Sequence, residues 1–217
     1  MADRNYRILL DGRWSLEDLT TFSRIYFQNY SFIYCLEKEV VRTASLRTES
    51  VLRQYELRHG LSYVNIYDIF RSHVEKQDRP QITSISYASP GWIELALNLE
   101  TATQFAKVLA IYLGAPVAVA TTYKKLHKIF IDLNEQRKKH ELKSLKLDAQ
   151  KAVEAQNLSN ELAEGLGFES LNALNEHTKD VEESSKLMLA HYRRVSRIAK
   201  FVQDGKASFP YENDDWQ

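Results

Sequence analysis

The sequence predicts a helix-dominant α+β fold, with a small three-stranded antiparallel sheet and covering helices, followed by a long antiparallel helical hairpin. The 217 residues contain seven Gly and four Pro, less than half of the combined share of about 12% in average proteins. Sandwiches and barrels of many short strands need turn residues about every 8–12 positions, so we expect long helices instead. Because 44% of the residues are hydrophobic, the chain can build a core.

The N-terminal part is expected to form one strand and then one long helix. Residues 6–10 alternate in polarity and end at a turn pair, which is typical of a strand. Ser15 is expected to start a helix over 15–43, because its hydroxyl can accept a hydrogen bond from a free amide of the first turn. Apolar residues recur in this segment at spacings of three or four, whereas Phe27 lies off that stripe. More than one face of the helix is therefore expected to be covered.

The next segments hold two less regular patterns and one clear hairpin. We expect a helix over 46–59 that is closed by a glycine. Residues 61–76 fit a helix or a strand, and the helix is preferred. Residues 82–87 and 92–97 alternate β-branched, polar and aromatic side chains around a Pro-Gly pair. Because Pro presets one turn dihedral and Gly supplies the positive one, these two segments predict a β-hairpin.

The remainder of the chain is predicted to be helical. We divide the chain into a compact α+β module over 1–100, a helical region over 101–204 and an acidic-aromatic tail over 205–217. One helix is expected to end just before Pro116, which suits the first position of the next. No breaker then follows until 165–167, and beyond it an apolar residue recurs every seventh position. Such a repeat indicates a supercoiled contact, so an antiparallel hairpin turning near 165–167 is expected.

Charge is divided into blocks along this expected hairpin. Residues 124–151 carry nine Lys and Arg against four Asp and Glu, 154–183 carry one against eight, and 186–200 carry five against none. A turn near 165–167 would place blocks of equal sign side by side, giving a rod with a negative tip and a positive root. Two such rods match in sign when they lie head to tail, which favours an antiparallel homodimer. The alternative is that these blocks are ordinary solvated faces.

The positive root is also a candidate site for an anion or a partner. The whole chain has 29 basic and 29 acidic residues, so it attracts nucleic acid weakly from a distance, but a local patch can still bind a phosphate backbone. The residues of this candidate site are Lys124, Lys125, Lys128, Arg193, Arg194, Arg197 and Lys200.

One short spacing points to nuclease chemistry. Arg53 stands six residues before His59, near the expected end of the helix over 46–59. This spacing resembles the Arg–(four to six residues)–His signature of the HEPN ribonucleases, over seven residues. The position after the Arg, a small polar residue in that family, is Gln54 here. The resemblance implies cleavage of a phosphodiester by Arg53 and His59 in an all-helical fold, with which the expected strands do not agree.

Other chemistry is not indicated by the sequence. The Gly residues are too scattered for a phosphate-binding loop, and the His residues are too far apart for a structural zinc site, so we expect neither cofactor nor metal. Cys35 stands among apolar residues and is expected to be a buried thiol. One Cys and the absence of a leader pattern predict a cytoplasmic location. The uncharged run over 108–123 is shorter than a membrane span of about 20 residues, so burial in the core is expected instead.

Two local patterns leave alternatives open. Asp68, Arg71 and His73 fit either an acid–base pair or the exposed side of an amphipathic element. The tail after Ser208 fits either a frayed terminus or a peptide that docks on a basic apolar groove.

Taken together, these patterns predict a non-enzymatic interaction or assembly protein that uses its hairpin for self-association or for holding a larger protein. The alternative is a nucleic-acid-directed protein, either a basic-patch binder or a HEPN-like ribonuclease.

Overall fold

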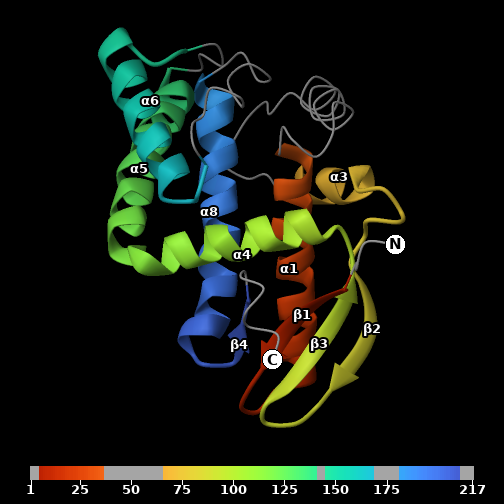
Figure 1. Cartoon of the computed structure of the whole chain (residues 1–217). Helices are drawn as coiled ribbons and strands as arrows, with labels where there is room; N and C mark the ends of the chain where they lie inside the picture. Colours follow the sequence, from red (N-terminus) through yellow and green to blue (C-terminus); the bar gives the residue numbers. More distant parts are fainter. Residues whose placement is uncertain (1–4, 37–65, 141–144, 169–180, 211–217) are drawn as a thin grey trace.

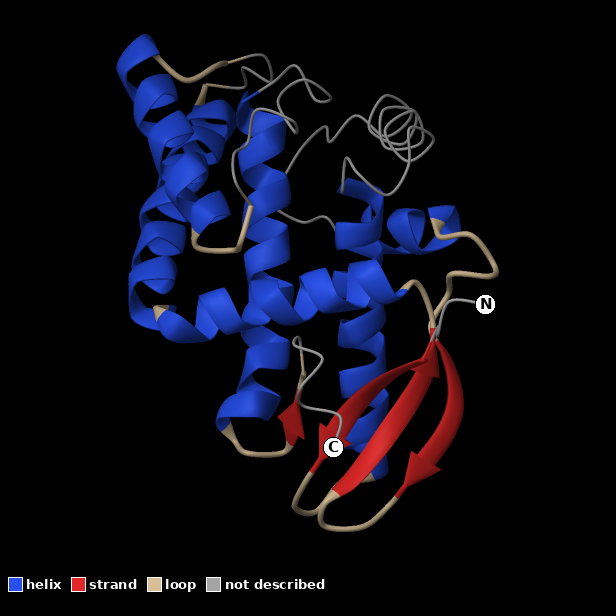
Figure 2. Ribbon diagram, viewed as in Figure 1, coloured by secondary structure: helices blue, strands red, loops and turns tan. Residues whose placement is uncertain are grey.

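The computed structural model describes residues 5–36, 66–140, 145–168 and 181–210. It is helix-dominant with a small antiparallel sheet, as predicted. Figure 1 shows the sheet at one end of the molecule and the helices beside and beyond it, and Figure 2 shows the same division by secondary structure. The described helices are α1 (Leu16–Leu36), α3 (Ile66–His73), α4 (Leu99–Gly114), α5 (Pro116–Lys139), α6 (Ala149–Glu164) and α8 (Val181–Gln203).

The sheet has four described strands rather than the three expected. They are β1 (Asn5–Leu10), β2 (Gln81–Ser86), β3 (Gly91–Ala96) and β4 (Ala207–Ser208), and their order is β2-β3-β1-β4. The three predicted strands correspond to β1, β2 and β3. The extra strand is only two residues long and pairs with β1 in antiparallel fashion, so its own sequence carries no alternating pattern that could predict it.

The β-hairpin predicted over 82–97 is confirmed, but Gly91 has a different role from the one expected. β2 and β3 pair in antiparallel fashion across the turn. The backbone angle φ of Gly12, Gly167 and Gly205 is positive, whereas that of Gly91 is not. A Cβ at Gly91 would overlap the carbonyl oxygen of Ser86 and lie 2.8 Å from that of Ala88. Glycine is therefore required here by close packing of the backbone.

The start of α1 is the one predicted from Ser15. The Ser15 hydroxyl accepts a hydrogen bond from the Asp18 amide (3.0 Å), and the Asp18 carboxylate accepts one from the Ser15 amide (3.1 Å). This reciprocal arrangement is a capping box, which satisfies two backbone donors. α1 is described to Leu36, and the rest of the helix expected over 15–43 lies outside the described residues, as does the helix expected over 46–59. The preference for a helix within 61–76 is confirmed by α3.

The core extends through both the sheet and the helical region. Inward residues of β1 and β3 belong to one hydrophobic cluster with residues of every described helix. Phe209, the first tail residue after β4, packs within this cluster against Phe22, Tyr26 and Phe105. The Tyr6 hydroxyl donates to the Pro210 carbonyl oxygen (2.8 Å), which fixes the start of the tail beside β1. Residues 211–217 lie outside the described part.

The long helix expected from Val117 to the glycine loop is interrupted. α5 ends at Lys139 and α6 begins at Ala149, where the Asp148 carboxylate accepts a hydrogen bond from the Lys151 amide (2.8 Å). α5 and α6 run antiparallel, since Thr122 near the start of α5 donates to Glu161 near the end of α6 (2.5 Å). The chain therefore turns between α5 and α6 as well as after α6, and Figure 1 shows α5, α6 and α8 packed together.

This second turn changes which charges are neighbours. The basic helix α5 lies against α6, which belongs to the acidic block. The expectation that blocks of equal sign lie side by side is therefore wrong for this pair. α5 is also linked to α8, because Arg137 donates two hydrogen bonds to the Glu182 carboxylate (2.8 and 2.9 Å). Lys186 forms a further ion pair with Glu182.

His191 of α8 is fully buried in the apolar core. Its ring stacks on Phe32 of α1, with the two ring centres 4.0 Å apart, and Phe168 meets it edge-on. Neither ring nitrogen has a hydrogen-bond partner among the described residues. Burial lowers the pKa of His191 to about 3. The imidazole is therefore neutral at physiological pH.

No single described helix has the length and apolar character of a membrane span. α4 and α5 meet that test only as a pair, and they are bent by 91° at their junction.

Candidate functional site

Three of the cationic residues predicted on α8 share one face of the helix, on which Arg197 and Lys200 are exposed and Arg193 is half-buried. Arg193, Arg197 and Lys200 follow one another at spacings of four and three, which places them on one side of the helix. Val195 and Ile198, on the other side, are fully buried in the core. Because the apolar side of α8 is fixed against its neighbours, this cationic side is held toward solvent.

Arg194 connects the cationic face of α8 with α3. Its guanidinium lies over the ring of Tyr67, 4.7 Å from the ring centre. Tyr67 is 1% exposed, and burial raises the pKa of its hydroxyl. A guanidinium over the face of an aromatic ring is attracted by the ring quadrupole. Tyr67 therefore serves as a fixed support beneath Arg194.

The same arrangement recurs between α3 and α1. Arg71, one turn after Tyr67, lies over the ring of Phe27 at 4.9 Å from the ring centre. Arg71 also pairs with Asp68 on its own helix (3.4 Å). The predicted group of Asp68, Arg71 and His73 is thus divided, since the His73 ring nitrogen Nδ1 lies 3.2 Å from the Ser72 hydroxyl.

Arg24 of α1 completes the arrangement. It lies one turn before Phe27, which places both on one side of α1. Partial burial lowers the pKa of Arg194, and the charges of Arg197, Arg193 and Arg24 lower it further, while Tyr67 opposes them. The charge of Arg24 on α1 thus acts on Arg194 in the same direction as the charges of Arg193 and Arg197. We call this set the arginine surface: Arg24, Arg71, Arg194 and Arg197, with Phe27 and Tyr67 beneath them.

The arginine surface is suited to binding anions. The Nε atoms of Arg71 and Arg194 are buried and have no hydrogen-bond partner among the described residues. A guanidinium that lies over a ring still has NH donors that face away from the ring, and two of them can bind a phosphate or carboxylate together. Several such groups close together raise the local concentration of anions.

The predicted lysines of α5 do not lie on the arginine surface. Tyr123 and His127 form the side of α5 toward α8, where Tyr123 stacks on Tyr192 with ring centres 4.1 Å apart. Lys124, Lys125 and Lys128 are exposed and lie between about 60° and 160° round the helix from His127. None of these lysines is among the charges that act on Arg194, whereas the charge of Arg193 acts on His127 of α5.

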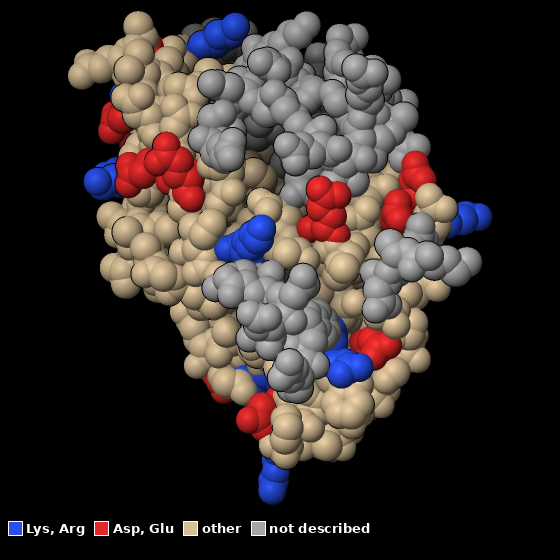
Figure 3. Space-filling model, in the orientation of Figure 1, with Lys and Arg blue, Asp and Glu red and all other residues tan. Residues whose placement is uncertain are grey.

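The arginine surface is turned away from α4. Tyr192 contacts Tyr112 of α4, and Arg194, two residues later, lies on nearly the opposite side of α8. Figure 3 shows the face that carries α4, on which basic and acidic side chains are interspersed. That face has no continuous basic patch among the residues described there.

The other sites predicted from the sequence provide little evidence of a function. Arg53 and His59 lie outside the described residues. Cys35 is buried, as predicted, and its thiol donates to the Phe70 carbonyl oxygen (3.7 Å). Among the described residues there is no group of His, Cys, Asp and Glu suited to hold a metal ion.

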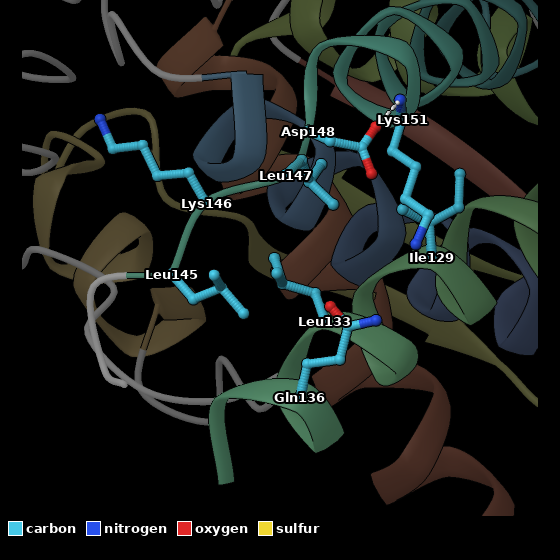
Figure 4. Close-up of a pocket in the computed structure, with 8 residues that line it drawn as sticks. All are labelled: Ile129, Leu133, Gln136, Leu145, Lys146, Leu147, Asp148 and Lys151. Atoms are coloured by element: carbon cyan, nitrogen blue, oxygen red, sulfur yellow. Dashed lines mark hydrogen bonds between the residues drawn. The ribbon is translucent and has the colours of Figure 1, made fainter. Parts of the chain in front are cut away.

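A hollow of about 210 Å³ lies between α5 and the start of α6. Figure 4 shows Leu133 and Leu145 pointing into it, with Lys146 directed outward. Asp148 is occupied as the cap of α6, so the polar rim offers little convergent chemistry. We assign this hollow no role.

Sequence reasoning missed Arg24 and Tyr67, and it considered Arg71 only together with Asp68 and His73. The one signal present was Phe27, which lies off the apolar stripe of its helix and is partly exposed. A search of protein-family models, of curated proteins and of solved structures finds no match to this chain.

Proposed function

We propose that the protein is a non-enzymatic interaction protein whose arginine surface binds the phosphate backbone of a nucleic acid. The observation that carries the proposal is that Arg194 of α8 lies over Tyr67 of α3 and Arg71 of α3 lies over Phe27 of α1, at 4.7 and 4.9 Å from the ring centres, so that packed helices hold these guanidinium groups in place. The charges of Arg197, Arg193 and Arg24 act on Arg194 as well and help to lower its pKa. Like charges held near one another cost free energy in the unbound protein. An anion that bridges them removes this cost, and binding is favoured accordingly.

The extent of the surface favours a polyanion. Its arginines belong to α1, α3 and α8, and Lys200 continues the cationic side along α8. One small anion can engage one or two guanidinium forks, whereas a nucleic acid offers a phosphate to each of them. Each phosphate that is neutralised also releases condensed counterions, which adds a favourable contribution at low salt.

Charge reversal on α8 tests the proposal. We expect Arg194→Glu combined with Arg197→Glu to weaken binding of fluorescently labelled RNA or DNA by about tenfold or more, and to reduce the dependence of log Kd on log salt by about two. The matched control is Lys124→Glu combined with Lys125→Glu, which makes the same change of charge on α5. Fluorescence anisotropy over a salt series measures both, and circular dichroism checks that each variant is folded.

The proposal is overturned if the wild-type protein does not bind at low salt, or if the two double variants weaken binding equally. It is also overturned if polyglutamate competes as effectively as RNA, because the surface would then bind any polyanion.

Self-association is a second candidate, favoured by the exposed edge strand β2. Ile82 is 56% exposed and Ile85 is 51% exposed, and the strand Gln81–Ser86 contains no charged residue. Natural proteins usually protect an edge strand with charges or prolines. A dimer formed through this edge would persist at high salt, unlike one oriented by charge, and Ile85→Lys would abolish it. Light scattering across a salt series distinguishes these outcomes, and a monomer at every concentration would exclude both.

A further inference from the structure

We infer that the nucleic acid bound by the arginine surface is double-stranded and is held by its backbone. This inference rests on the proposed function and adds the class of ligand. It follows from what lies beneath the guanidinium groups and from how the cations are spaced along α8.

The aromatic rings of the surface are not available to unpaired bases. Tyr67 is 1% exposed and lies beneath Arg194, and the ring of Phe27 lies beneath Arg71. Proteins that bind single strands usually offer exposed aromatic faces on which successive bases stack. Here Tyr67 is buried and one face of each ring carries an arginine, so the described part of this surface offers guanidinium donors rather than open ring faces, which favours binding to the backbone.

The neighbouring rings along α8 are occupied in the same way. Tyr192 stacks on Tyr123 of α5. Phe201 stacks on Trp14, with ring centres 5.4 Å apart, and meets Phe22 edge-on. Each of these described aromatic residues is therefore engaged within the protein. The exposed ring of Tyr87 lies at the hairpin of the sheet, not on α8.

The cations of α8 are arranged in a rigid row. Arg193 and Lys200 mark the ends of this row, and seven residues of helix separate them by about 10 Å. This length lies between the widths of the minor and major grooves of a B-form duplex, about 6 and 12 Å. A straight row of this length can contact phosphates on both sides of a groove of a stiff duplex, and a flexible single strand gains less from it.

The test compares a labelled duplex of about 20 base pairs with each of its separated strands at equal nucleotide concentration. The protein is full-length, and the readout is fluorescence anisotropy in one low-salt buffer, with RNA and DNA versions of each ligand. We expect the duplex to bind about tenfold more tightly than either strand. We also expect Arg194→Glu with Arg197→Glu to weaken binding of the duplex more than binding of the single strands.

The outcomes separate the inference from the proposed function. If a single strand binds as tightly as the duplex, or more tightly, and charge reversal weakens that binding, the function stands and the inference is wrong. If neither ligand binds, or if charge reversal on α8 changes neither affinity, both are wrong.

Discussion

Replacing His191 with Phe is expected to stabilise the protein, and to do so more strongly at pH 5 than at pH 7. The imidazole lies between Phe32 and Phe168, and its nitrogens have no partner among the described residues. A buried polar group without a partner costs about 1–3 kcal/mol, and a phenyl ring at the same place has no such group. The phenyl ring is slightly larger than the imidazole, so part of this gain is offset by tighter packing.

The pH dependence follows from the pKa of the buried ring. The folded protein holds the pKa of His191 at about 3, whereas an unfolded histidine has a pKa of about 6.5. Between these values the unfolded state binds one more proton, so stability is lost as the pH falls below about 6.5. Between pH 7 and pH 5 this proton uptake lowers the free energy of unfolding of the wild type by about 2 kcal/mol. The variant His191→Phe has no imidazole at this position and does not lose this free energy.

Urea unfolding at pH 5 and pH 7, followed by tryptophan fluorescence, measures this difference. Other titrating groups contribute equally to both proteins, so the difference between the wild type and the variant isolates His191. The matched control is His140→Gln, since His140 is exposed at the end of α5. If the wild type and His191→Phe lose the same free energy of unfolding between pH 7 and pH 5, the reasoning is wrong.

Two further predictions concern the links between α5 and α8 and the hairpin of the sheet. Burial of Glu182 opposes its ionisation, but the hydrogen bonds from Arg137 and Lys186 outweigh it and lower the pKa of the carboxyl. Glu182→Gln is therefore expected to lower the free energy of unfolding, measured with urea, by about 2 kcal/mol at pH 7. The loss should become smaller as the pH falls through the pKa of Glu182 in the folded protein, and an equal loss at acid pH would contradict this. Gly91→Ala is expected to lower stability by about 2 kcal/mol because its Cβ meets backbone atoms, whereas Gly114→Ala meets nothing within 4 Å and should be neutral or stabilising. Thermal melts of the two alanine variants test this, and equal melting temperatures would refute it.

Much of the fold could be predicted from local patterns in the sequence. Period-two alternation located β1, β2 and β3, and the capping residue Ser15 located the start of α1. The turn between α5 and α6 could not be found in this way, because 140–148 contains neither Gly nor Pro. The residue that could have indicated the turn is Asp148, which caps the start of α6. An Asp within a polar stretch is not recognisable as a helix cap unless the break before it is already known.

The candidate site was predicted in part. Arg193, Arg194 and Arg197 stand out in sequence because they lie close together on a helix without acidic neighbours. Tyr67, which lies beneath Arg194, and Arg24, whose charge acts on it, are more than a hundred residues away and look like ordinary members of amphipathic helices. Only tertiary packing of α1, α3 and α8 brings them together, and no local pattern encodes that packing.

The pairing of β1 with β4 has a consequence for biosynthesis. The first described strand lies beside the last, and Phe209 fills the space between Phe22 and Phe105. Until this segment has been translated, the nascent chain exposes that aromatic cavity and one edge of its sheet. Cooperative folding therefore requires the C-terminal end of the described chain. A chain on a ribosome stalled before residue 207 would be incompletely folded and accessible to chaperones and proteases.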